Sequence, residues 1–242
     1  MAWELAGLYV YSYLIGSVPT AYIIARLVKG IDIRRYGSGS VGGSNLFQQT
    51  GWWGAVPLGV FEVFGKGASH VWIGLYVLDL ERDSLALIVA PLLAAIGHNW
   101  SVFLRLTGGR GVVVTVGALL ALPAPPPWIL FVSLAIALVG WASTRSSGPS
   151  VLVAFLLLPL WAWLLHDSTA LVAYSGCAIA IAITKRLLAN WERPAPHLPK
   201  GRVFMNRLLK DRDTDDRADW LAREPSGDLS EHQGDNHAST AN

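Results

Sequence analysis

The chain has 242 residues, of which 52% are apolar and only 15% are charged, and its formal net charge is +2. Soluble domains carry about 25% charged residues, so this composition excludes an ordinary soluble globular protein. The single cysteine, Cys177, excludes an internal disulfide, a zinc cluster and an iron–sulfur cluster. The apolar residues are gathered in blocks close to the roughly 20 residues that a helix needs to cross a bilayer. The composition therefore predicts a polytopic membrane protein.

Seven apolar segments follow one another along the chain. In order, they are 4–28, 52–78, 84–106, 111–123, 128–144, 150–166 and 169–186. Each is expected to be helical, because a helix satisfies its own backbone hydrogen bonds in lipid. The segment 111–123 is shorter than the roughly 20 residues that an untilted crossing needs. The predicted fold class is all-α, with seven transmembrane helices.

Basic residues are concentrated in alternate connections between these segments. They lie in 30–51, 107–110 and 145–149 and after residue 186, whereas only Arg82 lies in an opposite loop. Lys and Arg near span ends are retained in the cytoplasm. This distribution predicts that the N-terminus is outside and the C-terminus is cytoplasmic.

The composition changes near residue 190, where prolines and mixed charges replace aliphatic residues. Residues 1–189 are predicted to form the seven-helix transmembrane domain. Residues 190–242 are predicted to form a cytoplasmic, largely disordered tail with one short surface helix near 203–210. Nucleic-acid binding is not expected, because the basic residues line a membrane face and are mixed with acids in the tail.

The first cytoplasmic loop is rich in glycine and serine. Between Gly37 and Asn45 it holds four glycines and three serines, and Arg34 precedes it. Glycine permits left-handed backbone, so consecutive N–H groups can converge on an anion, while the hydroxyls and the Asn45 amide add donors. A phosphate-binding loop and a merely flexible connection explain this pattern equally well. The formal match to G-x-G-x-x-G does not predict a dinucleotide fold, because no strand precedes it.

Two further turns on the same face have a similar character. One is the Gly108-Gly109-Arg110-Gly111 turn, which precedes the fourth segment, and the other contains Arg145, Ser147 and Ser150. A helix N-terminus attracts anions, and a guanidinium there can bind a phosphate through two hydrogen bonds. A tight turn with a cytoplasmic arginine explains either turn alone, but three such junctions on one face favour a single phosphate site.

Three polar residues inside the apolar segments require partners. Glu62 and Lys66 are four residues apart, so they share one helix face and can pair. His98 lies before the second glycine turn. An internal ion pair that fixes helix packing and a histidine bonded within the core are the structural interpretations. The functional alternative is a membrane transporter or lipid-binding protein that uses Glu62, Lys66 and His98 as a polar pathway.

Two strings resemble the first and second motifs of a known family. They are GSVPTAYIIARLVKGIDIRRYGSGSVGGSN and GHNWSVFLRLTGGRGVVVTVG, and the resemblance covers nearly all of residues 8–186. The family is that of the bacterial integral-membrane glycerol-3-phosphate acyltransferases that take their acyl chain from acyl phosphate. It implies seven helices in the bacterial inner membrane and an active site at the cytoplasmic face. The implied reaction acylates the 1-hydroxyl of glycerol 3-phosphate to give lysophosphatidic acid, the first step of phospholipid synthesis.

The resemblance also implies roles for individual residues. Ser38, Asn45, Arg110 and Ser147 are expected to be catalytic, with Arg110 neutralising phosphate and Ser147 or Ser150 standing for the serine of a third motif. The expected phosphate-binding residues are Arg34, Gly39, Ser40, Gly42, Gly43, Ser44, Gly108, Gly109, Gly111, Arg145 and Ser150. Glu62, Lys66 and His98 are expected to support the site. No motif predicts a metal ion or a cofactor, and the sequence leaves the oligomeric state open.

Several positions depart from the family pattern, among them Gly43 and Ser44, where the family has alanine and threonine. The family usually has asparagine at Ser40, arginine at Gln48 and lysine at Arg110. Arginine keeps the charge of lysine but changes the geometry of its hydrogen bonds, whereas Gln48 removes a charge. The departures motivate a second hypothesis, a divergent paralogue that acylates another phosphorylated polyol or lacks turnover.

Overall fold

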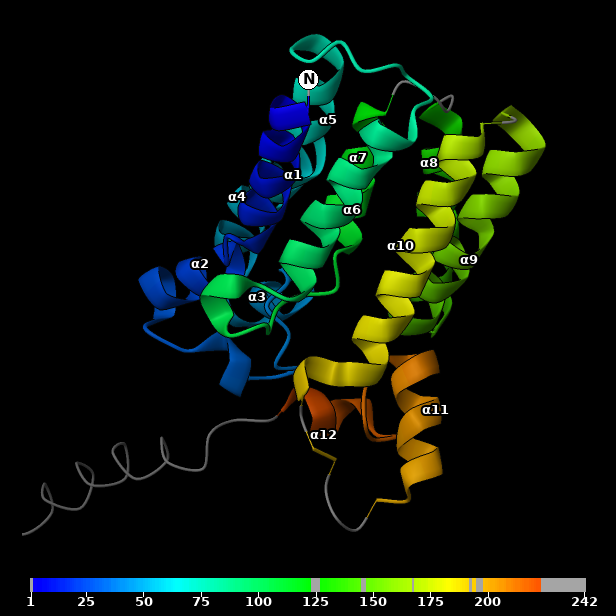
Figure 1. Ribbon diagram of the computed structural model, residues 1–242. Helices are drawn as coiled ribbons and strands as arrows, with labels where there is room; N and C mark the ends of the chain where they lie inside the picture. The colour runs from blue at the N-terminus through cyan, green and yellow to red at the C-terminus, as the bar shows by residue number, and fades with distance from the viewer. Residues whose placement is uncertain are drawn as a thin grey trace, which may run out of the picture.

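The computed structural model describes residues 2–122, 127–144, 147–166, 168–191, 193–194 and 198–222, which form helices and connections without any β-strand. Figure 1 shows a helical bundle with two short C-terminal helices packed at one end. The α-helices and the π-helix η2 are α1 (Ala2–Ser17), α2 (Thr20–Lys29), α3 (Gly43–Thr50), α4 (Trp52–Val60), η2 (Phe61–Ala68), α5 (Ser69–Tyr76), α6 (Leu85–Asn99), α7 (Val112–Ala121), α8 (Pro127–Thr144), α9 (Ser147–His166), α10 (Thr169–Leu188), α11 (Lys200–Lys210) and α12 (Arg217–Leu221). Short 3-10 turns are η1 (Ile33–Arg35), η3 (Val102–Leu104) and η4 (Ala189–Trp191).

Each of the seven apolar segments is helical, as predicted, although their bounds differ. The first is divided into α1 and α2 before Pro19, and the third ends at Asn99 rather than at 106. Within the described residues, three helical stretches are long and apolar enough to span a membrane by themselves: Ala2–Lys29, Ser147–Leu164 and Thr169–Leu188. The remaining apolar helices are shorter, so the count of seven crossings stays a prediction.

Small residues bring neighbouring helices into close contact. A Cβ atom at Gly16 of α1 would lie 2.2 Å from the carbonyl oxygen of Ala94 in α6, and one at Gly97 would lie 2.2 Å from that of Tyr13. A Cβ atom at Gly117 of α7 would likewise lie 2.2 Å from the carbonyl oxygen of Val63 in η2. Lipid supplies no hydrophobic drive between helices, so such close backbone packing stabilises the bundle.

Helices α4, η2 and α5 form one continuous helical stretch from Trp52 to Tyr76, which is wound as a π-helix in the middle. A π-helical turn has more residues between its hydrogen-bonded groups than an α-helical turn, so it changes the direction of the side chains beside it. Here it carries Glu62 and Lys66, whose side chains are buried. The distortion therefore turns two ionisable groups towards the interior.

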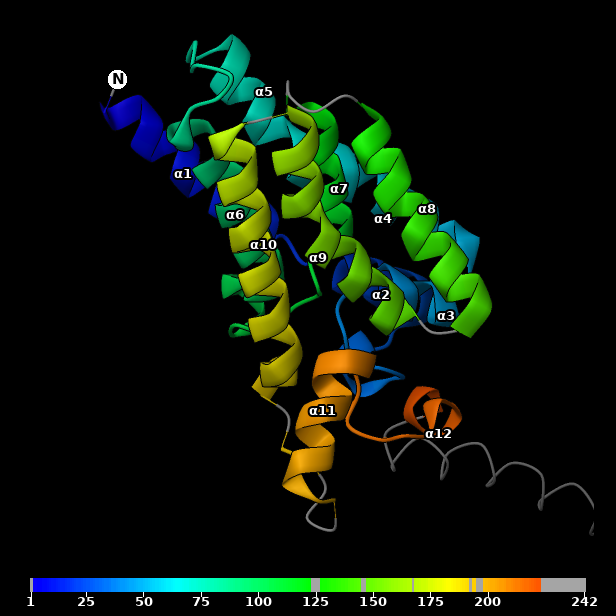
Figure 2. The ribbon, with the colours of Figure 1, turned by 90° about the vertical axis from the view of Figure 1, so that its right-hand side faces the viewer.

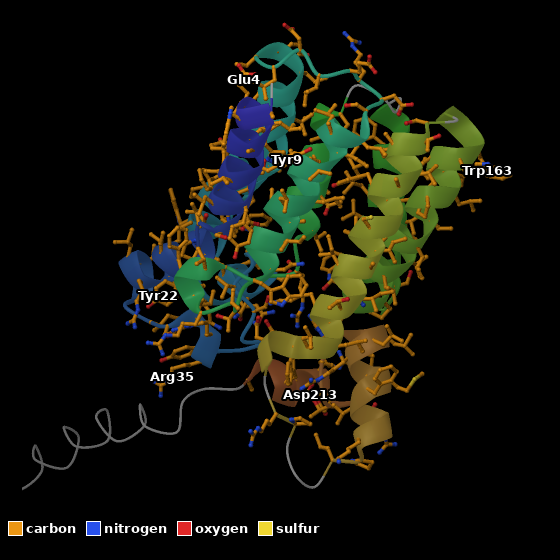
Figure 3. The ribbon with its side chains drawn as sticks, viewed as in Figure 1. Glu4, Tyr9, Tyr22, Arg35, Trp163 and Asp213 are labelled. Atoms are coloured by element: carbon orange, nitrogen blue, oxygen red, sulfur yellow. The ribbon has the colours of Figure 1, made fainter. Side chains whose placement is uncertain are left out.

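The two ends of the bundle differ in their residues. Figure 3 places Glu4 at one end and Arg35 and Asp213 at the other, while Trp163 points away from the bundle. The indole of Trp163 is exposed, as are those of Trp3 and Trp53. The polar end holds η1, α3, α11 and α12, and Figure 2 shows α11 and α12 beyond the ends of α8 and α9.

The C-terminal segment is more ordered than the sequence analysis expected. The predicted surface helix near 203–210 corresponds to α11, which packs on α9 and α10. Arg207 donates to the carboxylate of Asp213 with a distance of 2.6 Å between Nε and Oδ1, and Trp220 is buried. Composition could not predict this packing, because ion pairs rather than an apolar stripe hold the segment in place. The domain boundary at residue 189 stays a prediction, and residues 223–242 lie outside the described part.

Candidate active site

The glycine and serine loop between η1 and α3 is held from within by Asn45. The buried amide nitrogen of Asn45 donates to the carbonyl oxygens of Ile33, Tyr36 and Ser40, at 3.1, 3.1 and 3.0 Å. Gly37 and Gly39 have positive φ angles of 53° and 68°, which favour glycine. The Asn45 nitrogen is therefore occupied by the loop itself, so this residue fixes the shape of the loop.

The second glycine turn packs directly against the first loop. The backbone N–H of Val41 donates to the carbonyl oxygen of Gly108 at 3.3 Å, and that of Gly109 donates to the carbonyl oxygen of His98 at 3.1 Å. A Cβ atom at Gly109 would lie 2.1 Å from His98 Nε2. Glycine is required there because the turn passes against the imidazole ring.

Arg110 extends from this turn towards the C-terminal segment. Its Nε lies 2.8 Å from Oδ1 of Asp211, and both side chains are largely buried. The Nη1 atom of Arg110 is buried and has no hydrogen-bond partner among the described residues. Buried guanidinium groups are normally satisfied, so this nitrogen is available to an acceptor that binds beside it.

Glu62, Lys66 and His98 form a buried polar network beneath the two loops. Lys66 Nζ lies 3.4 Å from Glu62 Oε1 and 3.4 Å from His98 Nδ1, and the distance from His98 Nδ1 to Glu62 Oε1 is also 3.4 Å. Removing one partner would leave another charge uncompensated inside the protein. The network thereby fixes the imidazole ring that the second glycine turn contacts.

A cavity of about 780 Å³ joins these elements. Its polar wall includes residues of both glycine turns, the start of α9, and residues of the C-terminal segment. Its apolar wall comes from α3, α4, α7, α8, α9 and α10, and consists of Phe47, Trp52, Ala55, Leu58, Val112, Val113, Trp141, Val151, Leu152, Phe155 and Ala182. One space therefore offers both an anion-binding region and an apolar channel.

Three helices begin at the polar wall. α3 starts at Gly43, α7 at Val112 and α9 at Ser147, and the cavity touches all three of these residues. First-turn N–H groups lack partners within their helix, and the helix dipole adds partial positive charge at that end. Three such termini around one cavity make a strong site for phosphate groups.

Comparisons with known proteins show the family to which the chain belongs. The family model described as glycerol-3-phosphate acyltransferase matches residues 6–195. The chain belongs to the glycerol-3-phosphate acyltransferase family. It is 34% identical to glycerol-3-phosphate acyltransferase 5 of Dehalococcoides mccartyi, covering 87% of this chain and 90% of that protein. It is 38% identical to glycerol-3-phosphate acyltransferase 2 of Moorella thermoacetica, covering 78% and 96%.

A solved structure is also similar to this acyltransferase. It is the crystal structure of PlsY, an integral membrane glycerol 3-phosphate acyltransferase, in its glycerol 3-phosphate form. The TM-score is 0.69 at 25% identity, and the match covers 76% of this chain and 88% of that one. The predictions of the family and of an all-α membrane protein are confirmed, whereas the number of crossings and their orientation stay predictions.

The cavity of the acyltransferase brings many of the expected site residues together. Those on its wall are Ser38, Ser40, Gly42, Gly43, Ser44, Asn45, Glu62, His98, Arg110, Gly111 and Ser147. Gly39, Lys66, Gly108 and Gly109 do not line the cavity, although Lys66 and Gly109 contact His98, which does. Ser150 is buried near Gly140 of α8, because a Cβ atom at that glycine would lie 2.6 Å from its Oγ. Arg145 lies outside the described residues.

Arg34 lies apart from the cavity of the acyltransferase. Its guanidinium donates two hydrogen bonds to Asp32, at 2.9 and 2.7 Å, and lies 5.3 Å from the centre of the Tyr22 ring. The hydrogen bonds from Arg34 lower the pKa of the Asp32 carboxyl, and the same contact raises the pKa of Arg34. The carboxylate of Asp32 therefore compensates the guanidinium charge of Arg34, which was expected to bind phosphate.

Several residues around the site of this acyltransferase were not predicted from the sequence. Lys185 is fully buried and donates to the carbonyl oxygen of Asn99 and to Oδ1 of Asn190. Asn190 in turn donates to the carbonyl oxygen of Gly108 at 3.1 Å. Arg186 lines the cavity and donates to the carbonyl oxygen of Gly148 at 2.7 Å. The sequence does show Lys185 and Arg186 as two basic residues at the end of an apolar helix. The tendency of basic residues to lie on the cytoplasmic side of a membrane explains their position equally well, so it did not indicate a site.

Proposed function

We propose that this glycerol-3-phosphate acyltransferase transfers an acyl group from acyl phosphate to the 1-hydroxyl of glycerol 3-phosphate. The products are lysophosphatidic acid and inorganic phosphate. The observation that carries the proposal is the single cavity with three helix N-termini at its polar wall and an apolar wall beside them. Two phosphorylated substrates, of which one has a long hydrocarbon chain, need this combination.

The polar wall supplies donors to phosphate oxygens. The hydroxyls of Ser38, Ser40 and Ser147 and the backbone N–H groups at the helix starts lie around the cavity. The unpaired Nη1 of Arg110 adds a charged donor. Charge-assisted hydrogen bonds of this kind are stronger than neutral ones, so they orient a dianion and neutralise it. We infer that Asn45 acts as a positioning residue, because its amide nitrogen is occupied by the loop.

The apolar wall is suited to the acyl chain. Leu58 of α4 and the pair Leu152 and Phe155 of α9 come from two distant parts of the chain and leave an apolar surface between these helices. Burial of each CH₂ group contributes about 0.8 kcal/mol, so a long chain in this channel anchors the donor firmly. The carbonyl carbon then lies where the channel meets the phosphate-binding wall.

The reaction is a nucleophilic substitution at this carbonyl carbon. The acceptor hydroxyl forms the new ester bond, the bond between the carbonyl carbon and the phosphate oxygen breaks, and the hydroxyl proton leaves with hydrogen phosphate. Positioning both substrates in one dry site lowers the barrier, as does compensation of the charge on the leaving phosphate. Arg110 and the helix termini supply that compensation.

We further propose that the protein crosses the bacterial inner membrane seven times, with its N-terminus outside and its C-terminus and active site cytoplasmic. Arg35 lies at the polar end of the bundle, as Figure 3 shows, together with α11 and its basic residues, whereas Arg82 lies in the connection between α5 and α6. Retention of basic residues on the cytoplasmic side supports this orientation.

Site variants test the proposed function in the detergent-purified full chain. Phosphate release from palmitoyl phosphate should depend on glycerol 3-phosphate, and Arg110→Ala and Ser38→Ala should each lower kcat/KM. We expect a roughly 100-fold loss for Arg110→Ala and a roughly 10-fold loss for Ser38→Ala, because a charged donor contributes more than a neutral one.

Arg105→Ala is the matched control for Arg110→Ala, because its side chain is exposed on the same connection and does not line the cavity. It should keep nearly full activity. Equal losses in the Arg105 and Arg110 variants would contradict the assignment of the site, and undiminished activity in both Arg110→Ala and Ser38→Ala would do so as well.

A second candidate function is acylation of another phosphorylated polyol. It is favoured by Gln48 and Ser40, which line the cavity where the family pattern has arginine and asparagine. Fewer charges and a shorter side chain leave more room near the acceptor. Release of phosphate with another polyol phosphate at a higher kcat/KM than with glycerol 3-phosphate would establish this alternative.

A further inference from the structure

The segment 211–222 follows α11 and covers the polar end of the cavity. Asp211, Arg212, Arg217 and Trp220 from this segment line the cavity together with Lys210. All of them lie outside residues 6–195, which the family model matches. The cavity wall therefore includes residues that the two sequence motifs do not contain.

Specific contacts hold this segment in place. Asp211 pairs with Arg110 at 2.8 Å, and Asp213 pairs with the buried Arg207 at 2.6 Å. The side-chain amide of Asn206 donates to the carbonyl oxygen of Asp213 at 3.4 Å. Trp220 is only 7% exposed, so α12 is anchored by a buried indole. The segment is a fixed wall of the cavity in this structure.

The ion pairs of the segment leave two arginines uncompensated. Asp211 pairs with Arg110 and Asp213 pairs with Arg207, whereas Asp215 pairs with both Lys210 and Arg202. Arg212 donates to the carbonyl oxygens of Thr214 and Asp215, at 3.0 and 3.1 Å. Within the part of the chain that the structure describes, neither Arg212 nor the exposed Arg217 pairs with a carboxylate. Both cations border the cavity and remain available to an anion.

We infer that Arg212 and Arg217 bind the phosphate of the acceptor, so that the C-terminal segment determines affinity for glycerol 3-phosphate. This inference rests on the proposed function. The acceptor is water-soluble and must enter from the polar end, where Figure 2 shows α12. The donor phosphate is tied to the acyl chain, and therefore belongs beside the apolar wall and Arg110. Two arginines at the entrance suit the second dianion.

Steady-state kinetics on the full chain tests this assignment. Arg217→Ala should raise KM for glycerol 3-phosphate roughly 5- to 20-fold, the range expected for loss of one partly exposed charged hydrogen bond. KM for palmitoyl phosphate and kcat should change less than about twofold. Arg212→Ala should act in the same direction, and Arg212→Lys should retain most of the affinity if the charge matters more than its contacts with the local backbone.

Two arginine-to-alanine variants serve as controls. Arg202→Ala removes the same charge from the exposed face of α11, and Arg82→Ala removes it from the connection between α5 and α6. Neither residue lines the cavity, so both variants should keep the wild-type KM for glycerol 3-phosphate. An equal rise of KM in the controls would overturn the inference, as would a rise confined to palmitoyl phosphate or no change in Arg217→Ala.

Equilibrium binding of radiolabelled glycerol 3-phosphate, measured without any acyl donor, separates this inference from the proposed function. Weaker binding by Arg217→Ala than by wild type supports the inference even if turnover is absent. Equal binding by the two proteins overturns it even if the wild-type enzyme is active. Lack of acceptor-dependent turnover in wild type would contradict only the proposed function.

Discussion

Asp32 and Arg34 illustrate how a single contact changes the meaning of a motif residue. Arg34 precedes the glycine loop and was expected to bind phosphate, but its guanidinium forms two hydrogen bonds with Asp32. The sequence shows that both charges are close together along the chain. It does not show that the 3-10 turn η1 directs them at each other, with the N–H of Arg34 also donating to Asp32.

This pair predicts a pH dependence of stability. Because Arg34 lowers the pKa of Asp32, ionised Asp32 stabilises the fold above the ordinary carboxyl pKa, and this contribution is lost as pH falls through the lowered value. Asp32→Asn should therefore reduce the midpoint of thermal unfolding in detergent at pH 7, and the difference from wild type should vanish in strong acid. The exposed Glu81→Gln is the control. A difference that persists unchanged at every pH would refute this account of the pair.

Other residues also show that residue type can be interpreted from the sequence, whereas the partners of a side chain cannot. The sequence identified Ser38, Arg110 and Ser147 as polar groups at helix junctions on one predicted face, and all three border the cavity. It also identified the Asn45 amide as a donor, but its three acceptors lie in its own loop. Residue type reveals what a side chain can bind, whereas its partners depend on the backbone path.

At the scale of elements, the site depends on the contact between two glycine turns that are more than 60 residues apart in sequence. Val41 and Gly108 share a backbone hydrogen bond, and Gly109 fits against the His98 ring. Sequence patterns predicted each turn separately, as well as the helix that follows the second turn, whereas α3 (Gly43–Thr50) lies inside the segment that was predicted to be a loop. They could not predict that His98 would provide the surface against which the second turn closes, because that contact depends on tertiary packing.

Gly109→Ala tests the importance of this contact. The new Cβ atom would lie 2.1 Å from His98 Nε2 and 2.8 Å from the carbonyl oxygen of Val41, so the turn must move. A shift of about 1 Å in a catalytic element can cost roughly 100-fold in rate, and we expect a loss of this size in kcat/KM. Gly201→Ala in α11 is the matched control, since its Cβ atom would meet no atom within 4 Å. Near-wild-type activity of Gly109→Ala would contradict the proposed arrangement.

At the scale of the whole molecule, hydrophobic segments predicted the helices well because lipid enforces regular backbone hydrogen bonding. Their bounds were less accurate where Pro19 divides the first segment and where the 3-10 turn η3 follows the end of α6 at Asn99. The packing of residues 198–222 was not foreseen. This packing depends on ion pairs such as the one between Arg207 and Asp213. In the sequence alone, these residues cannot be distinguished from charged residues exposed to solvent.

The proposed orientation also belongs to this scale. In a Cys177→Ser background, Glu81→Cys and Arg202→Cys place single thiols in the connection between α5 and α6 and on α11. A membrane-impermeant maleimide added to intact spheroplasts should label the variant at position 81 and spare the variant at position 202. Lysis should expose both. The reverse pattern before lysis would contradict an outside N-terminus and a cytoplasmic site.

The central claim is that one cavity joins an acyl channel to a phosphate-binding wall and thereby acylates glycerol 3-phosphate. The most direct measurement is the product balance of the purified wild-type protein with palmitoyl phosphate and labelled glycerol 3-phosphate. We expect equal amounts of inorganic phosphate and labelled lysophosphatidic acid, acylated at the 1-hydroxyl. Phosphate release that is independent of the acceptor, or a folded protein that forms no labelled lipid, would contradict it.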